Sequence, residues 1–504
     1  MAVKIILLIL FFGVMMGIGV YARKHATDVN GFVLGGRSVG PWLTAFAYGT
    51  SYFSAVVFVG YAGQFGYKYG LASTWIGIGN AVIGSLVAWV VLGRRTRIMS
   101  KHLGSMTMPD FFGKRYDSQS LRIAASVIAF IFLIPYTASV YNGLSYLFGM
   151  AFDVDFRICV VVMAVLTGVY VIIGGYMATA WNDLIQGIIM LFGIVAVIAA
   201  VLSGHGGFMA AVKELAQVPS SVMPGAYASF LGPDPANLFG VVILTSLGTW
   251  GLPQMIQKFY AIKDEKAVHT GTIISTLFAI VVSGGCYFLG GFSRISGVKE
   301  AVDGTVKYDT IIPTMLSSLP DILIGIVIVL VLSASMSTLS SLVLTSSSTL
   351  TLDFIKPLFV KKMNEKQQLV WMRVLLAGFI LISVVIALDP PAFIAQLMGI
   401  SWGALAGAFL APFLYGLYWK GVTRAAVWAS FICGVGITVA NMFFRFIASP
   451  INAGAFAMVA GLVIVPVVSL ISPKLKKETV EDVFHCLEEK VMVEQKLALP
   501  EEEE

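Results

Sequence analysis

The stretch DILIGIVIVLVLSASMSTLSSLVLTSSSTLTLD, at residues 321–353, decides the fold. Its first half is apolar enough to enter a lipid bilayer, and its second half is rich in serine and threonine. Residues three or four positions apart share one face of a helix, so the stretch predicts a stripe of small and hydroxyl side chains. The stripe consists of Ala334, Ser337, Thr338 and Ser341, with Ser340 beside it.

Hydroxyl and carbonyl oxygens are the hard ligands that small cations prefer. We therefore interpret the stripe as half of a sodium site in a sodium-coupled transporter. The stretch alone leaves a second interpretation open, in which the hydroxyls only bond to their own helix or pack between helices.

The composition is that of a membrane protein. Hydrophobic residues make up 58% of the 504 residues and charged residues only 12%, whereas a soluble domain carries about 25% charged residues. The four cysteines are scattered, so their spacing predicts neither a disulfide nor a metal site. The net charge of +6 does not indicate a nucleic-acid partner.

About twenty apolar residues cross a bilayer, and on that rule we predict an all-α polytopic protein with about thirteen transmembrane helices. The predicted ranges are 3–22, 42–66, 71–93, 122–149, 156–175, 181–202, 236–259, 268–292, 312–351, 368–388, 392–418, 423–446 and 453–472. The ninth range is longer than a bilayer requires, so we expect it to be tilted or broken. The first range is interpreted as a retained span and not as a cleaved signal.

Basic residues predict the orientation. The loops after odd-numbered spans hold Arg23, Lys24, Arg37, Arg94, Arg95, Arg97, Lys101, Lys114, Arg115, Lys258, Lys263, Lys266, Lys356, Lys361, Lys362, Lys420, Arg424, Lys474, Lys476 and Lys477. The opposite loops hold chiefly Lys68, Lys213, Arg294, Lys299 and Lys307. Because basic loops stay inside, we expect the N-terminus outside and the C-terminus in the cytoplasm of a multi-pass inner-membrane protein.

One acid and two interrupted spans stand out within the membrane. Asp183 lies in GGYMATAWNDLIQG, and an intramembrane charge is functional by default, although an acid at a helix N-terminus is the alternative. The second span clusters glycine and hydroxyl residues around Gly49 to Ser54, and the seventh breaks near Gly248, Gly251 and Pro253. If spans 2–6 and 7–11 are two repeats, the two interruptions occupy equivalent positions. Paired interruptions of this kind favour a transport site over close helix packing.

Three segments together resemble the sodium:solute symporter family, whose members carry proline, pantothenate, sugars, sialic acid, iodide and monocarboxylates. They are GFVLGGRSVGPW (31–42), GGYMATAWNDLIQ (174–186) and SASMSTLSS (333–341). The resemblance implies a five-plus-five inverted-repeat, leucine-transporter-like core. It divides the chain into an extra N-terminal span (1–30), a first repeat (31–202), a second repeat (203–418), two peripheral spans (419–473) and a charged cytoplasmic tail (474–504).

The resemblance also implies ligand sets. The main sodium site would use the backbone carbonyls of Thr50, Phe53 and Ala334 with the hydroxyls of Ser337 and Thr338. A second sodium would use Asp183, Ser337, Ser340 and Ser341. The solute cavity would include Tyr52, Ser54, Gln64, Tyr136, Asn142, Thr249, Trp250 and Gln396.

The chain departs from particular carriers at informative positions. Tyr52 stands where proline carriers have an acid, and Val56 and Val57 stand where sugar carriers have an acidic and amide pair. No basic residue is obviously available to pair a solute carboxylate. The solute therefore stays open among amino acids, carboxylates and vitamin-like compounds.

The resulting hypothesis is a secondary active transporter that imports a small organic solute with sodium by alternating access. The alternatives are an uncoupled facilitator or channel, and a proton-coupled symporter of the same fold. An enzyme is not expected, because the sequence holds no paired acid–base or nucleophile constellation. The expected partners are the solute, sodium and the lipid bilayer, and the sequence leaves the oligomeric state undetermined.

Overall fold

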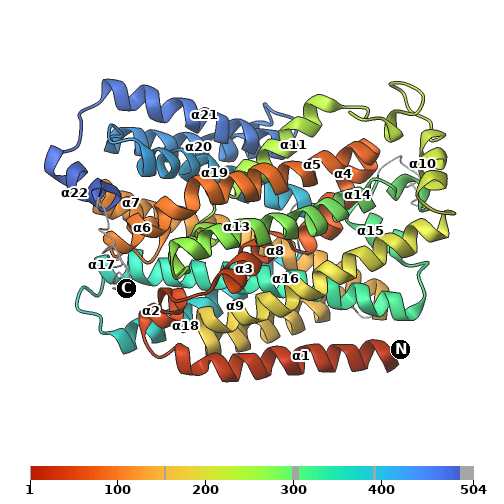
Figure 1. Ribbon diagram of the computed structural model, residues 1–504, viewed down its shortest axis with the longest axis horizontal. Coiled ribbons are helices and arrows are strands. Elements are labelled where there is room, and N and C mark those ends of the chain that lie inside the picture. Colours follow the sequence, from red (N-terminus) through yellow and green to blue (C-terminus); the bar gives the residue numbers. More distant parts are fainter. Residues whose placement is uncertain (1, 153–154, 298–305, 390–392, 489–504) are drawn as a thin grey trace, which may run out of the picture.

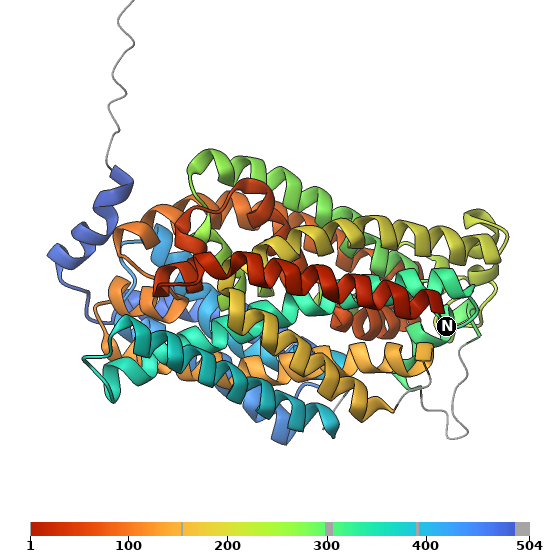
Figure 2. The ribbon, with the colours of Figure 1, turned by 90° about the horizontal axis from the view of Figure 1, so that it is seen from below.

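The computed structural model describes residues 2–152, 155–297, 306–389 and 393–488. These residues form helices and turns, with a single isolated β-bridge between Val39 and Ile262 in the described part of the chain. The helices lie along one long axis, with α1 starting at one end of the bundle and α22 lying at the other (Figures 1 and 2).

The α-helices have the following bounds: α1 Ala2–Ala22, α2 Val29–Leu34, α3 Pro41–Tyr52, α4 Ala62–Tyr69, α5 Thr74–Gly79, α6 Arg94–His102, α7 Met108–Arg115, α8 Gln119–Phe152, α9 Phe156–Gly204, α10 Phe208–Ala216, α11 Pro235–Gly248, α12 Pro253–Ala261, α13 Glu265–Ala279, α14 Gly285–Gly290, α15 Ile311–Leu316, α16 Asp321–Thr349, α17 Lys356–Leu358, α18 Glu365–Leu388, α19 Ile394–Tyr418, α20 Arg424–Phe444, α21 Pro450–Ile471 and α22 Lys477–Glu488.

Within the described residues, eleven helical segments are long and apolar enough to cross a membrane. Two of them, Val56–His102 and Phe156–Gly204, are 47 and 49 residues long, about twice what one crossing needs. Each contains a glycine in a conformation that L-residues avoid, Gly70 with φ 62° and Gly175 with φ 56°. If each of these two long segments is divided at its glycine, the eleven segments become thirteen spans, which is the number predicted from the sequence.

Helix α16 is the central element of the bundle. It packs against α8, α9, α1 and α3, while α19, α20 and α21 form a layer on the other side from α1 (Figure 1). Every residue from Leu330 to Thr349 is buried. The hydroxyl-rich half of α16 therefore faces protein on all sides, which explains how so polar a segment can lie inside an apolar bundle.

The predicted ninth span, 312–351, is broken near its start, as its excess length led us to expect. Residues Ile311–Leu316 form a separate short helix, α15, and α16 begins at Asp321 after Pro320. Proline has no backbone N–H and a fixed φ, so it suits a helix start and not a helix interior. Beyond Thr349 the span continues through a π-helical turn, Leu350–Ile355, into α17.

Both predicted interruptions are confirmed. Helix α3 ends at Tyr52, Phe53 is extended with φ −89° and ψ 108°, and the chain resumes helical form in a π-helical turn at Val56–Tyr61. Helix α11 ends at Gly248, and α12 begins at Pro253 after the extended Leu252. The chain is buried at each break, as Phe53 and Ser54 at the first and Thr249 and Leu252 at the second show.

Two backbones touch where α4 meets α14, and this contact generates a test of the fold. A Cβ built on Gly66 would lie 2.0 Å from the carbonyl oxygen of Gly290. Rigid backbone cannot yield there, so Gly66→Ala should lower the free energy of unfolding by at least about 1–3 kcal/mol. Thermal unfolding of the detergent-solubilised protein would measure it. Gly436→Ala on α20 is the control, since nothing lies within 4 Å of its added Cβ; equal effects would contradict the packing.

Candidate functional site

The hydroxyls of α16 meet the backbone carbonyls at the break in α3. The Ser337 hydroxyl lies 3.0 Å from the Thr50 carbonyl oxygen, and the Thr338 hydroxyl lies 3.1 Å from the same oxygen. The Thr338 hydroxyl is also 3.4 Å from the Phe53 carbonyl oxygen. Both hydroxyls are 3.1 Å from the Ala334 carbonyl oxygen of their own helix. All five oxygens predicted for the main sodium site therefore gather in one buried cluster.

The chemistry of this cluster suits an alkali cation. It offers three carbonyl oxygens and two hydroxyl oxygens, all hard and none charged. A hydroxyl that donates its hydrogen to a carbonyl can rotate and offer a lone pair to an ion instead. No group of three or more histidine, cysteine or acidic side chains within the described residues could hold a metal ion. The cluster thus differs from a site that fixes a divalent or transition metal.

The residues predicted for a second sodium lie beside a lysine. Asp183, on α9, is fully buried, and neither carboxylate oxygen has a hydrogen-bond partner in the described part of the chain. The Lys258 Nζ lies 3.9 Å from Asp183 Oδ2 and 3.0 Å from the Ser341 hydroxyl. The Ser340 hydroxyl instead donates to the Ser337 carbonyl, 2.8 Å away.

Sequence reasoning assigned Lys258 to a cytoplasmic loop, and that assignment is wrong. Its side chain is 2% exposed, because α12 continues through Lys258 to Ala261 inside the bundle. A lysine near the end of an apolar run is ordinarily interfacial, so the position alone gave no warning. Pro253 could have indicated the correct position. Proline favours the first turn of a helix, and a helix that starts at Pro253 continues past Lys258.

Two of the eight predicted solute residues present unsatisfied polar atoms. Gln64 Oε1 and Asn142 Oδ1 are buried and have no hydrogen-bond partner within the described residues. Gln64 lies on α4, in the half-helix after the first break, and Asn142 lies on α8. A bound solute could supply the missing donors, because buried polar atoms are seldom left unpaired.

Four other predicted solute residues are engaged in local structure. Thr249 Oγ1 and Trp250 Nε1 lie 3.1 Å and 3.0 Å from the backbone carbonyl oxygens of Gly84 and Ile83. The Ser54 hydroxyl accepts the Val56 N–H at 3.1 Å. The Tyr136 ring packs edge-on against Trp402, with ring centroids 5.8 Å apart.

Of the remaining two, Gln396 is half-buried near the start of α19. The side chain of Tyr52 lies outside the described part of the structure.

Sequence reasoning missed one residue at the second break. Gln254 is fully buried directly after Pro253, and both of its side-chain amide atoms lack partners in the described structure. It sits in the first turn of α12, where backbone N–H groups lack intrahelical acceptors. The break itself was predicted, so an amide immediately beyond it could have been included.

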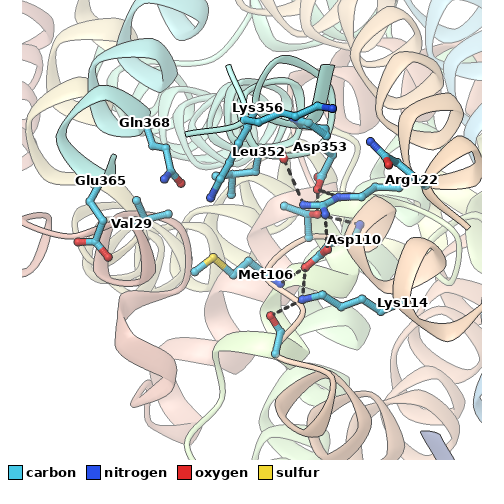
Figure 3. Close-up of a pocket in the computed structure, with 15 residues that line it drawn as sticks. Val29, Met106, Asp110, Lys114, Arg122, Leu352, Asp353, Lys356, Glu365 and Gln368 are labelled. Carbon is cyan, nitrogen blue, oxygen red and sulfur yellow. Dashed lines mark hydrogen bonds and ion pairs between the residues drawn. The ribbon is translucent and has the colours of Figure 1, made fainter. Parts of the chain in front are cut away.

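A charged cluster ties the far end of α16 to α7 and α8. Arg122 Nε lies 2.7 Å from Asp353 Oδ1, and Arg122 Nη1 lies 3.2 Å from Asp110 Oδ1. Lys114 Nζ is 2.9 Å from the other oxygen of Asp110. Figure 3 shows these side chains converging along one wall of a cleft of about 620 Å³. The helix that carries the hydroxyl cluster is therefore anchored at this end by ion pairs.

The sodium:solute symporter family profile matches residues 32–434 of this chain. The chain belongs to the sodium:solute symporter family. It is accordingly a sodium-coupled secondary transporter of a small solute and not an enzyme. A sodium/proline symporter of Staphylococcus aureus is 28% identical over 486 residues, which cover 94% of this chain and 93% of the relative.

Solved structures bear out the leucine-transporter-like fold. A sodium-coupled sialic acid symporter in a substrate-bound outward-open state superposes with a TM-score of 0.77 at 16% identity, covering 94% of this chain and 99% of its own. A nucleobase-cation-symport-1 family transporter with bound bromovinylhydantoin gives 0.55 at 13% identity, covering 90% and 97%. The residue boundaries of the two repeats stay a prediction.

The ion pairs at the end of α16 generate a second test. Arg122→Ala would leave the fully buried Asp353 carboxylate without its cationic partner, while the Thr107 hydroxyl would still donate to it. Removing one member of a buried pair costs about 3–5 kcal/mol, so the melting temperature in detergent should fall by several degrees. Arg94→Ala is the control, because the Arg94–Glu265 pair is solvent-exposed and should contribute about 0–1 kcal/mol. Similar melting temperatures for both variants would contradict the anchoring role.

Proposed function

We propose that this protein imports a small organic solute together with sodium bound at the main cluster. The ligands are the carbonyl oxygens of Thr50, Phe53 and Ala334 and the hydroxyls of Ser337 and Thr338. The observation that carries the proposal is the approach of both α16 hydroxyls to the carbonyls freed at the α3 break.

Sodium at this cluster joins two elements that belong to different parts of the chain. Without the ion, hydroxyl-to-carbonyl hydrogen bonds hold α3 and α16 together; with it, all five oxygens turn toward one charge. Sodium thereby fixes the shape of the α3 break, which also borders the solute cavity. Coupling of this kind is reciprocal, so solute binding raises sodium affinity by the same factor. An inward membrane potential adds about 2.3 kcal/mol per charge per 100 mV.

The solute belongs to the amino acid, carboxylate or vitamin-like class and binds between the two breaks. Gln64, Asn142 and Gln254 supply uncharged amides with unused hydrogen-bonding capacity. The N-terminus of α12 favours a carboxylate, as half-helix ends do in other transporters. The similar proteins named above carry proline or sialic acid, both of which contain a carboxylate. The other residues that we assign to solute binding are Tyr52, Ser54, Tyr136, Thr249, Trp250 and Gln396.

The proposed orientation in the cell membrane puts the N-terminus outside and the C-terminus in the cytoplasm. The distribution of basic residues between the loops supports this orientation, even when the buried Lys258 is excluded from the count. The N-terminal start of α1 and helix α22 lie at opposite ends of the bundle, which agrees with an odd number of crossings (Figure 1).

Uptake by proteoliposomes tests the proposal. A panel of labelled amino acids, monocarboxylates and vitamins would be offered with either sodium or potassium outside. We expect accumulation of one class above equilibrium in sodium only. Equal uptake in both salts would identify an uncoupled facilitator, and uptake driven by a pH gradient without sodium would identify a proton-coupled symporter.

A third prediction concerns the hydroxyls of the main site. Thr338→Ala and Ser337→Ala each remove one oxygen ligand and should raise the sodium concentration for half-maximal uptake by roughly 10- to 100-fold. That range corresponds to about 1.5–3 kcal/mol for one contact to a charged group. Ser347→Ala is the matched control on the same helix, since within the described residues its hydroxyl donates only to the Leu344 carbonyl, at 3.1 Å. Unchanged sodium dependence in both site variants would overturn the assignment.

A further inference from the structure

We propose that the Lys258 ammonium occupies the second predicted cation position, so that this protein couples solute transport to one sodium ion and not two. The proposal rests on the main sodium site described above and determines its stoichiometry. It follows from a buried lysine that lies among the residues expected to hold a second ion.

Three other helices, α3, α9 and α16, contribute to the surroundings of the ammonium. Ser341 from α16 lies 3.0 Å from Lys258 Nζ, and Asp183 from α9 places Oδ2 3.9 Å away. The Ser51 hydroxyl from α3 is 2.9 Å from the Ser341 hydroxyl. The Tyr176 ring faces the same nitrogen, with its centroid 5.1 Å away. A carboxylate, a hydroxyl and an aromatic face are the groups that stabilise a buried cation.

Neighbouring contacts hold the lysine in this position. Gln257 Nε2 donates to the Val33 carbonyl at 2.9 Å, and the Thr345 hydroxyl lies 2.6 Å from Gln257 Oε1. These bonds fasten α12 to α2 and α16 at the residue immediately before Lys258. The ammonium is consequently part of the packed bundle and not a mobile side chain at the surface.

Charge balance decides what this position can hold. Asp183 is the one acid in the predicted second set, since Ser337, Ser340 and Ser341 are neutral. One carboxylate compensates one cation, and Lys258 already supplies it. A sodium ion bound by Ser341 would lie roughly 4 Å from the ammonium, where repulsion between two unit charges weakens binding by roughly a thousandfold at an effective dielectric constant of about 20.

The main site escapes this repulsion. Ser337 lies one helical turn from Ser341, about 6 Å along the axis. The Asp183–Lys258 pair is neutral as a whole, so a sodium ion at the main cluster faces no net charge. The Asp183–Lys258 pair therefore blocks the second cation position and leaves the main sodium cluster available.

Equilibrium binding of radioactive sodium to the purified full-length protein in detergent tests the stoichiometry. We expect one ion per chain in the wild type and in Lys258→Arg, which keeps the charge. Lys258→Met should bind a second ion, because Asp183 then lacks its cation. Lys258→Met combined with Asp183→Asn should return to one, and Asp183→Asn alone should stay at one.

Stability gives a second readout for variants that fold poorly. Sodium should raise the melting temperature of Lys258→Met more than that of the wild type, because the ion replaces the lost ammonium. The double variant, which has neither charge, should show only the wild-type increase. Two sodium ions per wild-type chain, or an unchanged count together with an unchanged sodium-dependent shift in Lys258→Met, would overturn the lysine proposal alone. No bound sodium in the wild type would overturn the main site as well.

Discussion

The structure depends on one constraint: a helix that is broken inside a bilayer exposes carbonyl oxygens that no water can satisfy. Thr50 and Phe53 carry those oxygens here, and the hydroxyls of α16 reach them. The requirement explains why a serine- and threonine-rich segment lies at the centre of the bundle and why all of its residues from Leu330 to Thr349 are buried. The oxygens joined by these hydrogen bonds are the ones that we propose as ligands of a small cation.

Two fully buried acids of the bundle each lie beside a basic side chain. Asp183 is matched by Lys258, and Asp353 by Arg122, each pair bridging helices that are distant in sequence. The cluster of five oxygens carries no charge at all. A sodium ion arriving there would be the net charge on which the membrane potential acts, and its departure would restore neutrality. The two ion pairs stabilise the bundle, and the proposed sodium site is uncharged. This arrangement is consistent with one net positive charge crossing the membrane in each transport cycle.

Much of this arrangement could be predicted from the sequence because it depends on local patterns. The hydroxyl stripe of α16 follows from helical spacing, and the two breaks follow from glycine, hydroxyl and proline residues within apolar runs. The position of the break in the range 312–351 was not predicted, because hydropathy alone does not detect the turn before Pro320. Lys258 was misplaced because a lysine at the end of an apolar segment looks interfacial, and only the fold shows that α12 continues through the core. Thr249 and Trp250 also hydrogen-bond to the backbone carbonyls of Gly84 and Ile83, partners that sequence spacing cannot identify.

The central claim is that an alkali ion binds where the α3 break meets α16. The most direct measurement is a pair of high-resolution electron cryo-microscopy maps, one in sodium and one in choline. The account predicts, in sodium only, a density peak among the carbonyls of Thr50, Phe53 and Ala334 and the hydroxyls of Ser337 and Thr338. In choline the two hydroxyls should bond directly to the carbonyls. A sodium-dependent peak confined to Asp183, or an α16 whose hydroxyls face lipid, would contradict it.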